Sequence, residues 1–130
     1  FKIVDHLTGE NLSQVLLLFD EILRFGFDGH NFIIGLSEHL RNLMVCKDPN
    51  TVQLMEVPDT AKVRYVEQAS NTPLSFLLSA LNILSKCDLS YKASKNQRLH
   101  VELALMKLTH LNSAIQLATH SEDGLKKKVA

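Results

Sequence analysis

The chain has 130 residues, the length of one domain, and 45% of them are apolar, which is enough for a sizeable core. Lysine plus arginine and aspartate plus glutamate are balanced at 14 each. This neutral balance argues against a dedicated nucleic-acid binder, because such proteins use clustered positive charge to displace counterions from phosphates. No apolar stretch approaches the roughly 20 residues of a membrane span, so we expect no membrane contact.

The first residue bears on whether the chain is part of a longer protein, and the two cysteines bear on its cellular compartment. A chain that begins at Phe1 and not at methionine is expected to be a piece of a longer protein. Cys46 and Cys87 lie within apolar helical patterns, and two isolated cysteines do not make a disulfide framework. We therefore expect free, buried thiols and a cytoplasmic location, where thiols stay reduced.

Helical periodicity dominates the N-terminal part of the chain. A short helical turn is predicted over residues 3–7, ending at Gly9. A longer helix is predicted over residues 10–25 and is ended by Gly26, because glycine reaches left-handed backbone angles without a steric penalty. Its apolar stripe has helical spacing and consists of Leu12, Val15, Leu16, Phe19, Ile22 and Leu23.

The middle of the chain contains a long helix, an ambiguous connector and a shorter helix. The long helix is predicted to begin after Asp28, a suitable N-cap, and to end before Pro49, since proline cannot continue a helix. Residues 51–59 fit either a single helical turn or an extended connector. A shorter helix is predicted over residues 61–70, following a start signal at Pro58.

The C-terminal part has two leucine-rich helices. Thr72 as N-cap and Pro73 at the first helical position predict the start of one of them. Its apolar stripe consists of Leu74, Leu77, Leu78, Leu81 and Leu84. We expect this stripe to pack in the core, and a groove for a partner is the alternative. The last helix, over residues 97–117, is apolar on two sides, and so wide an apolar surface is typical of a central helix. We therefore expect Leu103 to be buried, so that its replacement by aspartate would unfold the domain.

These elements predict an all-α bundle of five or six helices over residues 1–120, followed by a polar, frayed tail over residues 121–130. The helices carry more apolar positions than one buried side each requires. Because burial of one leucine stabilises a fold by roughly 2 kcal/mol, a small domain cannot leave many leucines in water. The surplus predicts apolar surface that another chain covers.

The sequence offers no catalytic, cofactor-binding or metal-ligating residues. Its five glycines never form a GxxxxGK phosphate loop, and its six histidines are scattered, without an HExxH motif. Two exposed ion pairs are predicted from helical spacing, Glu21 with Arg24 and Arg98 with Glu102. We therefore expect no enzyme activity in this chain. A small metal-dependent enzyme that gathers distant histidines is one alternative.

Two segments resemble the third domain of the bacterial DNA polymerase III gamma/tau subunit. They are LRNLMVCKD over residues 40–48 and ASKNQRLHVELALMKL over residues 93–108, where the family reads roughly "LRdLLv-K" and "s-NpRL-lE-aLlkL". The matching positions are Leu40, Arg41, Leu43, Lys47, Asn96, Arg98, Leu99, Glu102, Leu105 and Leu108. The resemblance covers about residues 1–117, and Gln97 stands where the family often has proline.

The resemblance implies a role in the clamp loader of DNA replication. In that family an N-terminal ATPase module binds ATP and Mg²⁺, and the third domain forms a collar that holds the subunits in a ring while the sliding clamp is loaded. The implied function is an oligomerisation domain of a DNA-directed DNA polymerase, a transferase, with other clamp-loader subunits as partners. The domain itself would bind neither ATP nor DNA. The alternative is an unrelated helical adaptor that binds a partner helix in an apolar groove.

Overall fold

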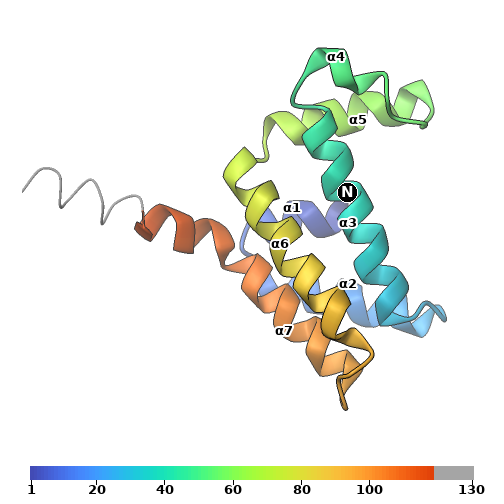
Figure 1. Cartoon of the computed structure of the whole chain (residues 1–130), viewed down its shortest axis with the longest axis vertical. Helices are drawn as coiled ribbons and strands as arrows, with labels where there is room; N and C mark the ends of the chain where they lie inside the picture. Colours follow the sequence, from blue (N-terminus) through green and yellow to red (C-terminus); the bar gives the residue numbers. More distant parts are fainter. Residues whose placement is uncertain (119–130) are drawn as a thin grey trace, which may run out of the picture.

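The computed structural model describes residues 1–118, and within them every regular element is helical (Figure 1). The helices are α1 (Lys2–Thr8), α2 (Leu12–Arg24), α3 (Gly29–Val45), α4 (Pro49–Val52), α5 (Asp59–Ser70), α6 (Leu74–Tyr91) and α7 (Gln97–Thr109), and residues 111–118 are also helical. The prediction of an all-α fold is confirmed. The described residues hold more helices than the five or six predicted, because α4 forms a turn of its own and the last predicted helix is interrupted at His110.

The first two helices follow the predicted pattern closely. Between them, Glu10 has a φ of 56°, and beyond α2 Gly26 has a φ of 94°, so the glycine ends the helix as predicted. The N-cap of α2 is Asn11, whose side chain accepts a hydrogen bond from the amide of Gln14. The turn at Glu10 joins α1 to α2, and these two helices pack against each other.

Two aspartates cap the starts of helix α3 and of the single helical turn α4. The side chain of Asp28 accepts a hydrogen bond from the amide of Asn31 at 2.7 Å, which confirms the predicted N-cap. Asp48 caps α4 in the same way, through the amide of Asn50 at 2.8 Å. The stretch that the sequence left ambiguous is thus one helical turn followed by a non-helical connector that ends at Pro58.

Helices α4 and α5 lie at one end of the molecule, beyond the other helices (Figure 1). Lys47, just after α3, holds this end in place, because its Nζ donates hydrogen bonds to the carbonyl oxygens of Ala69 and Thr72. The predicted N-cap at Thr72 is wrong. Its buried hydroxyl donates instead to the carbonyl oxygen of Gln68 at 2.7 Å, and Pro73 occupies the N-cap position of α6.

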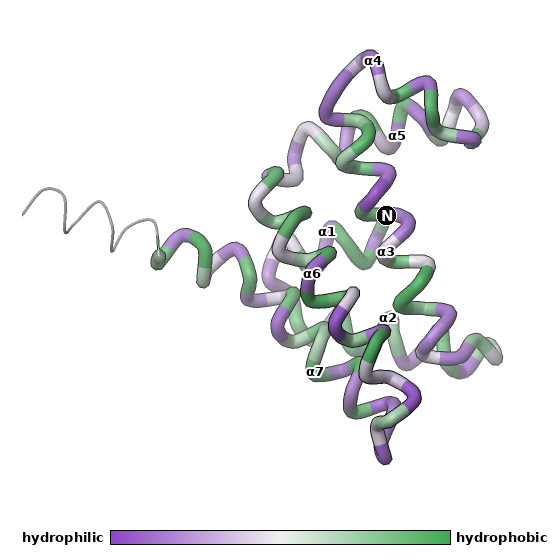
Figure 2. Tube along the Cα trace, in the orientation of Figure 1, coloured by the Kyte–Doolittle hydropathy of each residue, from purple (hydrophilic) through white to green (hydrophobic). Residues whose placement is uncertain are grey.

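The core lies where α6 packs against α3 and α7, with α1 and α2 behind them (Figure 1). Hydrophobic positions recur along both α6 and α7 (Figure 2). The fully buried large side chains are Phe19, Phe76, Leu7, Ile33, Leu40, Leu43, Leu77, Leu84, Leu105, Leu108, Val4 and Val15. Within residues 1–118, no helix combines the length and apolarity required to cross a membrane.

Both cysteines are free and buried, as predicted. Burial raises the pKa of the thiols of Cys46 and Cys87, so both stay protonated near neutral pH. The predicted tail over residues 121–130, and the predicted domain end at residue 120, lie outside the described residues.

Candidate protein-binding surface

Helix α7 is apolar on two sides, but only one of them faces the core. Val101 and Leu105 are fully buried, whereas Leu99 and Leu103 are each 46% exposed. Residues two apart on a helix differ by about 200° in direction, so Leu103 points away from the side that buries Leu105. The prediction that Leu103 is buried is therefore wrong, because α1, α2, α3 and α6 pack against the other side of α7 and leave this side exposed.

Leu99, Leu103 and Met106 form an outward-facing row that we call the α7 stripe. They are four and three residues apart, the spacing at which side chains share one face of a helix. Met106 is half-buried and the two leucines are more exposed. The α7 stripe is thus an apolar surface about two turns long that the described residues leave uncovered.

A second row lies on α6 and consists of Leu74, Leu78 and Leu81, the α6 stripe. Leu74 is 49% and Leu78 is 53% exposed, and Leu81 is half-buried. The prediction that this leucine-rich helix packs into the core holds for Leu77 and Leu84, which are fully buried, and is wrong for Leu74 and Leu78. The four outward leucines belong to the surplus that the sequence indicated.

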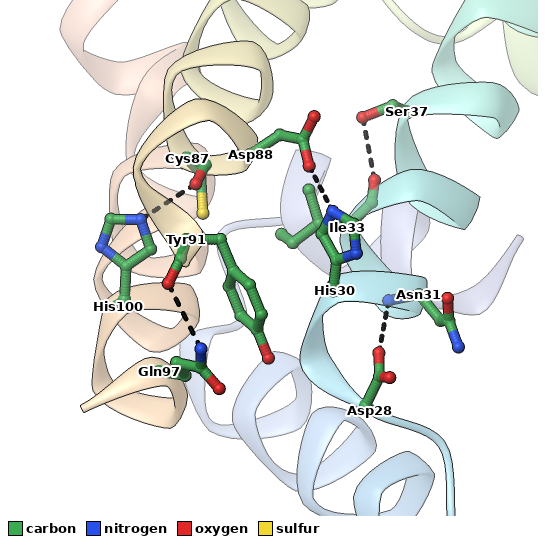
Figure 3. Close-up of polar contacts among 10 residues, drawn as sticks. All are labelled: Asp28, His30, Asn31, Ile33, Ser37, Cys87, Asp88, Tyr91, Gln97 and His100. Carbon is green, nitrogen blue, oxygen red and sulfur yellow. Dashed lines mark hydrogen bonds and ion pairs between the residues drawn. The ribbon is translucent and has the colours of Figure 1, made fainter. Parts of the chain in front are cut away.

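The two stripes lie on different sides of the molecule. Asp88, seven residues after Leu81 and so on the same side of α6, pairs with His30 of α3 at 2.6 Å (Figure 3). Ile83, on the other side of α6, lines a groove between α6 and α7. The α6 stripe therefore lies towards α3, and the α7 stripe lies beyond the groove.

The groove between α6 and α7 has a volume of about 310 Å³. His100 of α7 ties the two helices together there, because its Nε2 donates a hydrogen bond to the carbonyl oxygen of Cys87 at 3.0 Å (Figure 3). Lys86 and Lys107 line the groove from opposite helices. It adjoins the α7 stripe, since Leu103 belongs to both.

Other exposed apolar side chains are distributed over the rest of the described surface. Together with the four stripe leucines, the exposed large apolar residues are Leu17, Phe25, Phe27, Ile34, Leu54, Val63, Val66, Leu74, Leu78, Leu89, Leu99, Leu103 and Leu117. The predicted surplus of apolar surface is therefore present.

Most positions of the two family-like segments have a role inside the domain. Leu40, Leu43, Leu105 and Leu108 are fully buried. The side chain of Asn96 caps α7 by accepting a hydrogen bond from the amide of Leu99 at 3.0 Å. A structural role for these positions is sufficient to explain their residue types.

Arg98 joins α7 to α2. Its Nη2 donates to Oδ1 of Asp20 at 2.8 Å, and its Nε lies 3.4 Å from Oε1 of Glu102. The predicted pair with Glu102 is thus present but longer than the contact with Asp20. Arg24 also pairs with Asp20, at 2.9 Å, and not with Glu21 as predicted. The contact between Asp20 and Arg98 spans 78 residues of sequence, so no local spacing could have indicated it.

The pKa of Asp20 is lowered, first by the hydrogen bond from Arg98 and also by the charge of Arg24. Asp20 therefore stays ionised at lower pH than an isolated aspartate does. Arg98 makes this carboxylate a link between α2 and α7, while Arg24 lies on α2 itself. Arg98, Glu102 and Lys47 thus also have structural roles.

The structural roles described above leave two exposed motif positions, Leu99 and Arg41, unexplained. The side chain of Arg41 is exposed, and its Nη1 donates to Oδ1 of the neighbouring Asn42 at 3.2 Å. Packing in the core does not account for these two side chains.

The histidines do not gather into a metal site within residues 1–118, where no group of three histidine, cysteine, aspartate or glutamate side chains could hold an ion. His39 is half-buried, and its Nε2 lies 2.6 Å from Oε1 of Gln68. Burial lowers the pKa of His39, while the hydrogen bond to Gln68 raises it. His39 thus contributes to packing between α3 and α5.

Residues 1–122 match a model of the family described as DNA polymerase III subunits gamma and tau domain III. The match spans both family-like segments and all of the described residues. Comparisons with curated proteins and with solved structures gave no significant match. The resemblance inferred from the sequence is confirmed.

Proposed function

The chain belongs to the family of domain III of the DNA polymerase III subunits gamma and tau, and on this premise we propose that it is a clamp-loader oligomerisation domain. In this role it holds the ATPase subunits in a ring that loads the sliding clamp for DNA replication. The observation that carries the proposal is the pair of outward leucine stripes on α6 and α7, which lie on different sides of the domain.

A ring requires two unlike surfaces on each subunit, because its contacts are head-to-tail. The α6 stripe and the α7 stripe meet this requirement, since one lies towards α3 and the other lies beyond the α6–α7 groove. A leucine that is half exposed still gains about 1 kcal/mol when a neighbour covers it. Leu74, Leu78, Leu99 and Leu103 would therefore all favour association.

The proposal assigns ATP and Mg²⁺ to the ATPase module of the parent protein and none to this domain. The sequence has no phosphate loop, and its formal net charge is zero, which gives little attraction for DNA. The partners are therefore other clamp-loader subunits, in the cytoplasm. ATP turnover by the pure domain would contradict this part of the proposal.

The parent protein provides the test, with charged residues placed in each stripe. One variant combines Leu99→Glu with Leu103→Glu, and a second combines Leu74→Glu with Leu78→Glu. A matched control combines Leu17→Glu with Val63→Glu, which are exposed on α2 and α5. Light scattering after size-exclusion chromatography, in the presence of the other clamp-loader subunits, measures assembly.

We expect both stripe variants to lose assembly, because each would place carboxylates in an apolar contact. The control should assemble like the unmodified protein, and circular dichroism should show all three variants folded. Normal assembly of both stripe variants would refute the proposal.

A further inference from the structure

The groove between α6 and α7 combines apolar walls with positive charge. Ile83, Leu103 and Ala104 supply apolar surface, and Lys86 and Lys107 approach from opposite helices. No carboxylate is among the residues that line it. In a domain whose charges balance overall, this local excess of positive charge favours a negatively charged partner.

The charge of Lys107 reaches the groove wall. Burial raises the pKa of the Cys87 thiol, Asp88 raises it further, and Lys107 lowers it, so the ammonium acts on a side chain from the opposite helix. His100 uses Nε2 for the carbonyl oxygen of Cys87, and its other ring nitrogen points away from α6 (Figure 3). The groove thus presents two lysine ammonium groups, and both can bind carboxylates.

The apolar surface extends beyond the groove along α7. Leu103 lines the groove, Leu99 lies one turn before it and Met106 lies one turn after it. At 1.5 Å per residue, the α7 stripe is about 10 Å long, which is the length of two turns of a partner helix. A partner helix with leucines on one side and acidic residues beside them would fit both the groove and the α7 stripe.

We propose that the groove and the α7 stripe together bind an acidic amphipathic helix of an unlike subunit in the assembly. This inference rests on the proposed function and gives the chemistry of one of its partners. Leucines of the partner would cover Leu99 and Leu103, while its carboxylates would pair with Lys86 and Lys107.

A second copy of this chain fits the surface less well. Its α6 stripe is flanked by polar, uncharged residues such as Ser75, Asn82 and Ser85. Asp88, the carboxylate on that side, is already paired with His30 at 2.6 Å. Because the second copy offers leucines without free carboxylates there, the partner of the α7 side is a different polypeptide.

The test uses the full-length parent protein and two labelled peptides of about 16 residues, a length that supports a helix in water. Both peptides carry leucines at helical spacing, with glutamates beside them in one and lysines in the other. The variant of the parent protein combines Lys86→Glu with Lys107→Glu. A matched control combines Lys2→Glu with Lys95→Glu, two lysines that do not line the groove.

Fluorescence anisotropy measures the dissociation constants. We expect the unmodified protein and the control to prefer the acidic peptide, with affinity that falls as salt concentration rises. The Lys86→Glu/Lys107→Glu variant should bind the acidic peptide about tenfold more weakly or worse, and should instead bind the lysine peptide.

The inference fails if the unmodified protein does not bind the acidic peptide, or if charge reversal at Lys86 and Lys107 leaves its affinity unchanged. The proposed function has a separate readout, because assembly of the Leu74→Glu/Leu78→Glu variant does not depend on the groove. Loss of assembly in that variant, together with a negative peptide result, would refute only the acidic partner. Normal assembly of both stripe variants would refute the proposed function.

Discussion

Helices α2 and α7 pack against each other, yet they differ in the number of apolar sides that they have. Helix α2 buries Val15 and Phe19 and directs polar side chains such as Gln14 and Glu21 towards water, with Leu17 as a single exposed leucine among them. Helix α7 buries Val101 and Leu105 but also exposes Leu99 and Leu103. The comparison teaches that one apolar stripe suffices to build a helix into this core, so a second stripe calls for a neighbouring chain.

The two sides of α7 should respond very differently to the same substitution. Leu105→Ala should lower the free energy of unfolding by about 2–5 kcal/mol, because it removes fully buried methyl groups and leaves a cavity. Leu103→Ala should lower it by about 1 kcal/mol or less, since water already reaches this side chain. Urea unfolding followed by circular dichroism measures both.

Leu103→Asp sharpens this test. It should leave the domain folded and impair assembly of the parent protein, contrary to the unfolding that the sequence alone predicts. Equal losses of stability in Leu103→Ala and Leu105→Ala would show that α7 has no outward side.

Replacing the N-cap residues of α2 and α7 should reduce stability by smaller amounts, and the two losses should differ. Asn96→Ala should destabilise the domain by about 1 kcal/mol, because the amide of Leu99 loses its partner at 3.0 Å. Asn11→Ala should cost less, since the bond from the amide of Gln14 is longer, at 3.4 Å. Urea unfolding of both variants, with Asn96→Asp as a control that keeps the cap, measures the difference. The reverse order would contradict the cap assignment for α7.

The smallest expected effect concerns the ionic link between the two helices. Because Arg98 and Arg24 lower the pKa of Asp20, the folded state favours the carboxylate more than the unfolded state does. Its contribution to stability is present above the unfolded pKa, and it is lost as pH falls through the lowered pKa. NMR titration of Asp20 should show a higher pKa in Arg98→Met than in the unmodified protein.

Arg41→Met provides the matched control, since Arg41 donates to Asn42 and not to Asp20. An unchanged pKa of Asp20 in Arg98→Met would show that α2 and α7 are not joined by this pair in solution.

The helices themselves could be predicted from the sequence, and their packing partners could not. Local signals sufficed at Asp28, which caps α3, and at Gly26, which ends α2. At Thr72 the same local reasoning failed, because the hydroxyl bonds back to Gln68 within α5. Periodicity shows that leucines share a side of a helix, but the inward side depends on which other helices are present.

The candidate surface was visible in the sequence only as an excess of leucines. The outward direction of Leu74 and Leu78 could not be inferred, because their neighbours Leu77 and Leu84 have the same residue type and helical spacing. The groove depends on the packing of α6 against α7, which brings Lys86 and Lys107 to its walls. Such features follow from tertiary packing and leave no local pattern.

The central claim is that the outward leucines of α6 and α7 are covered by neighbouring subunits. Hydroxyl-radical footprinting of the parent protein, alone and in the assembled clamp loader, tests it most directly. We predict that oxidation of Leu74, Leu78, Leu99 and Leu103 falls on assembly while oxidation of Leu17 is unchanged. Equal oxidation of the four leucines in the free and assembled states would contradict the claim.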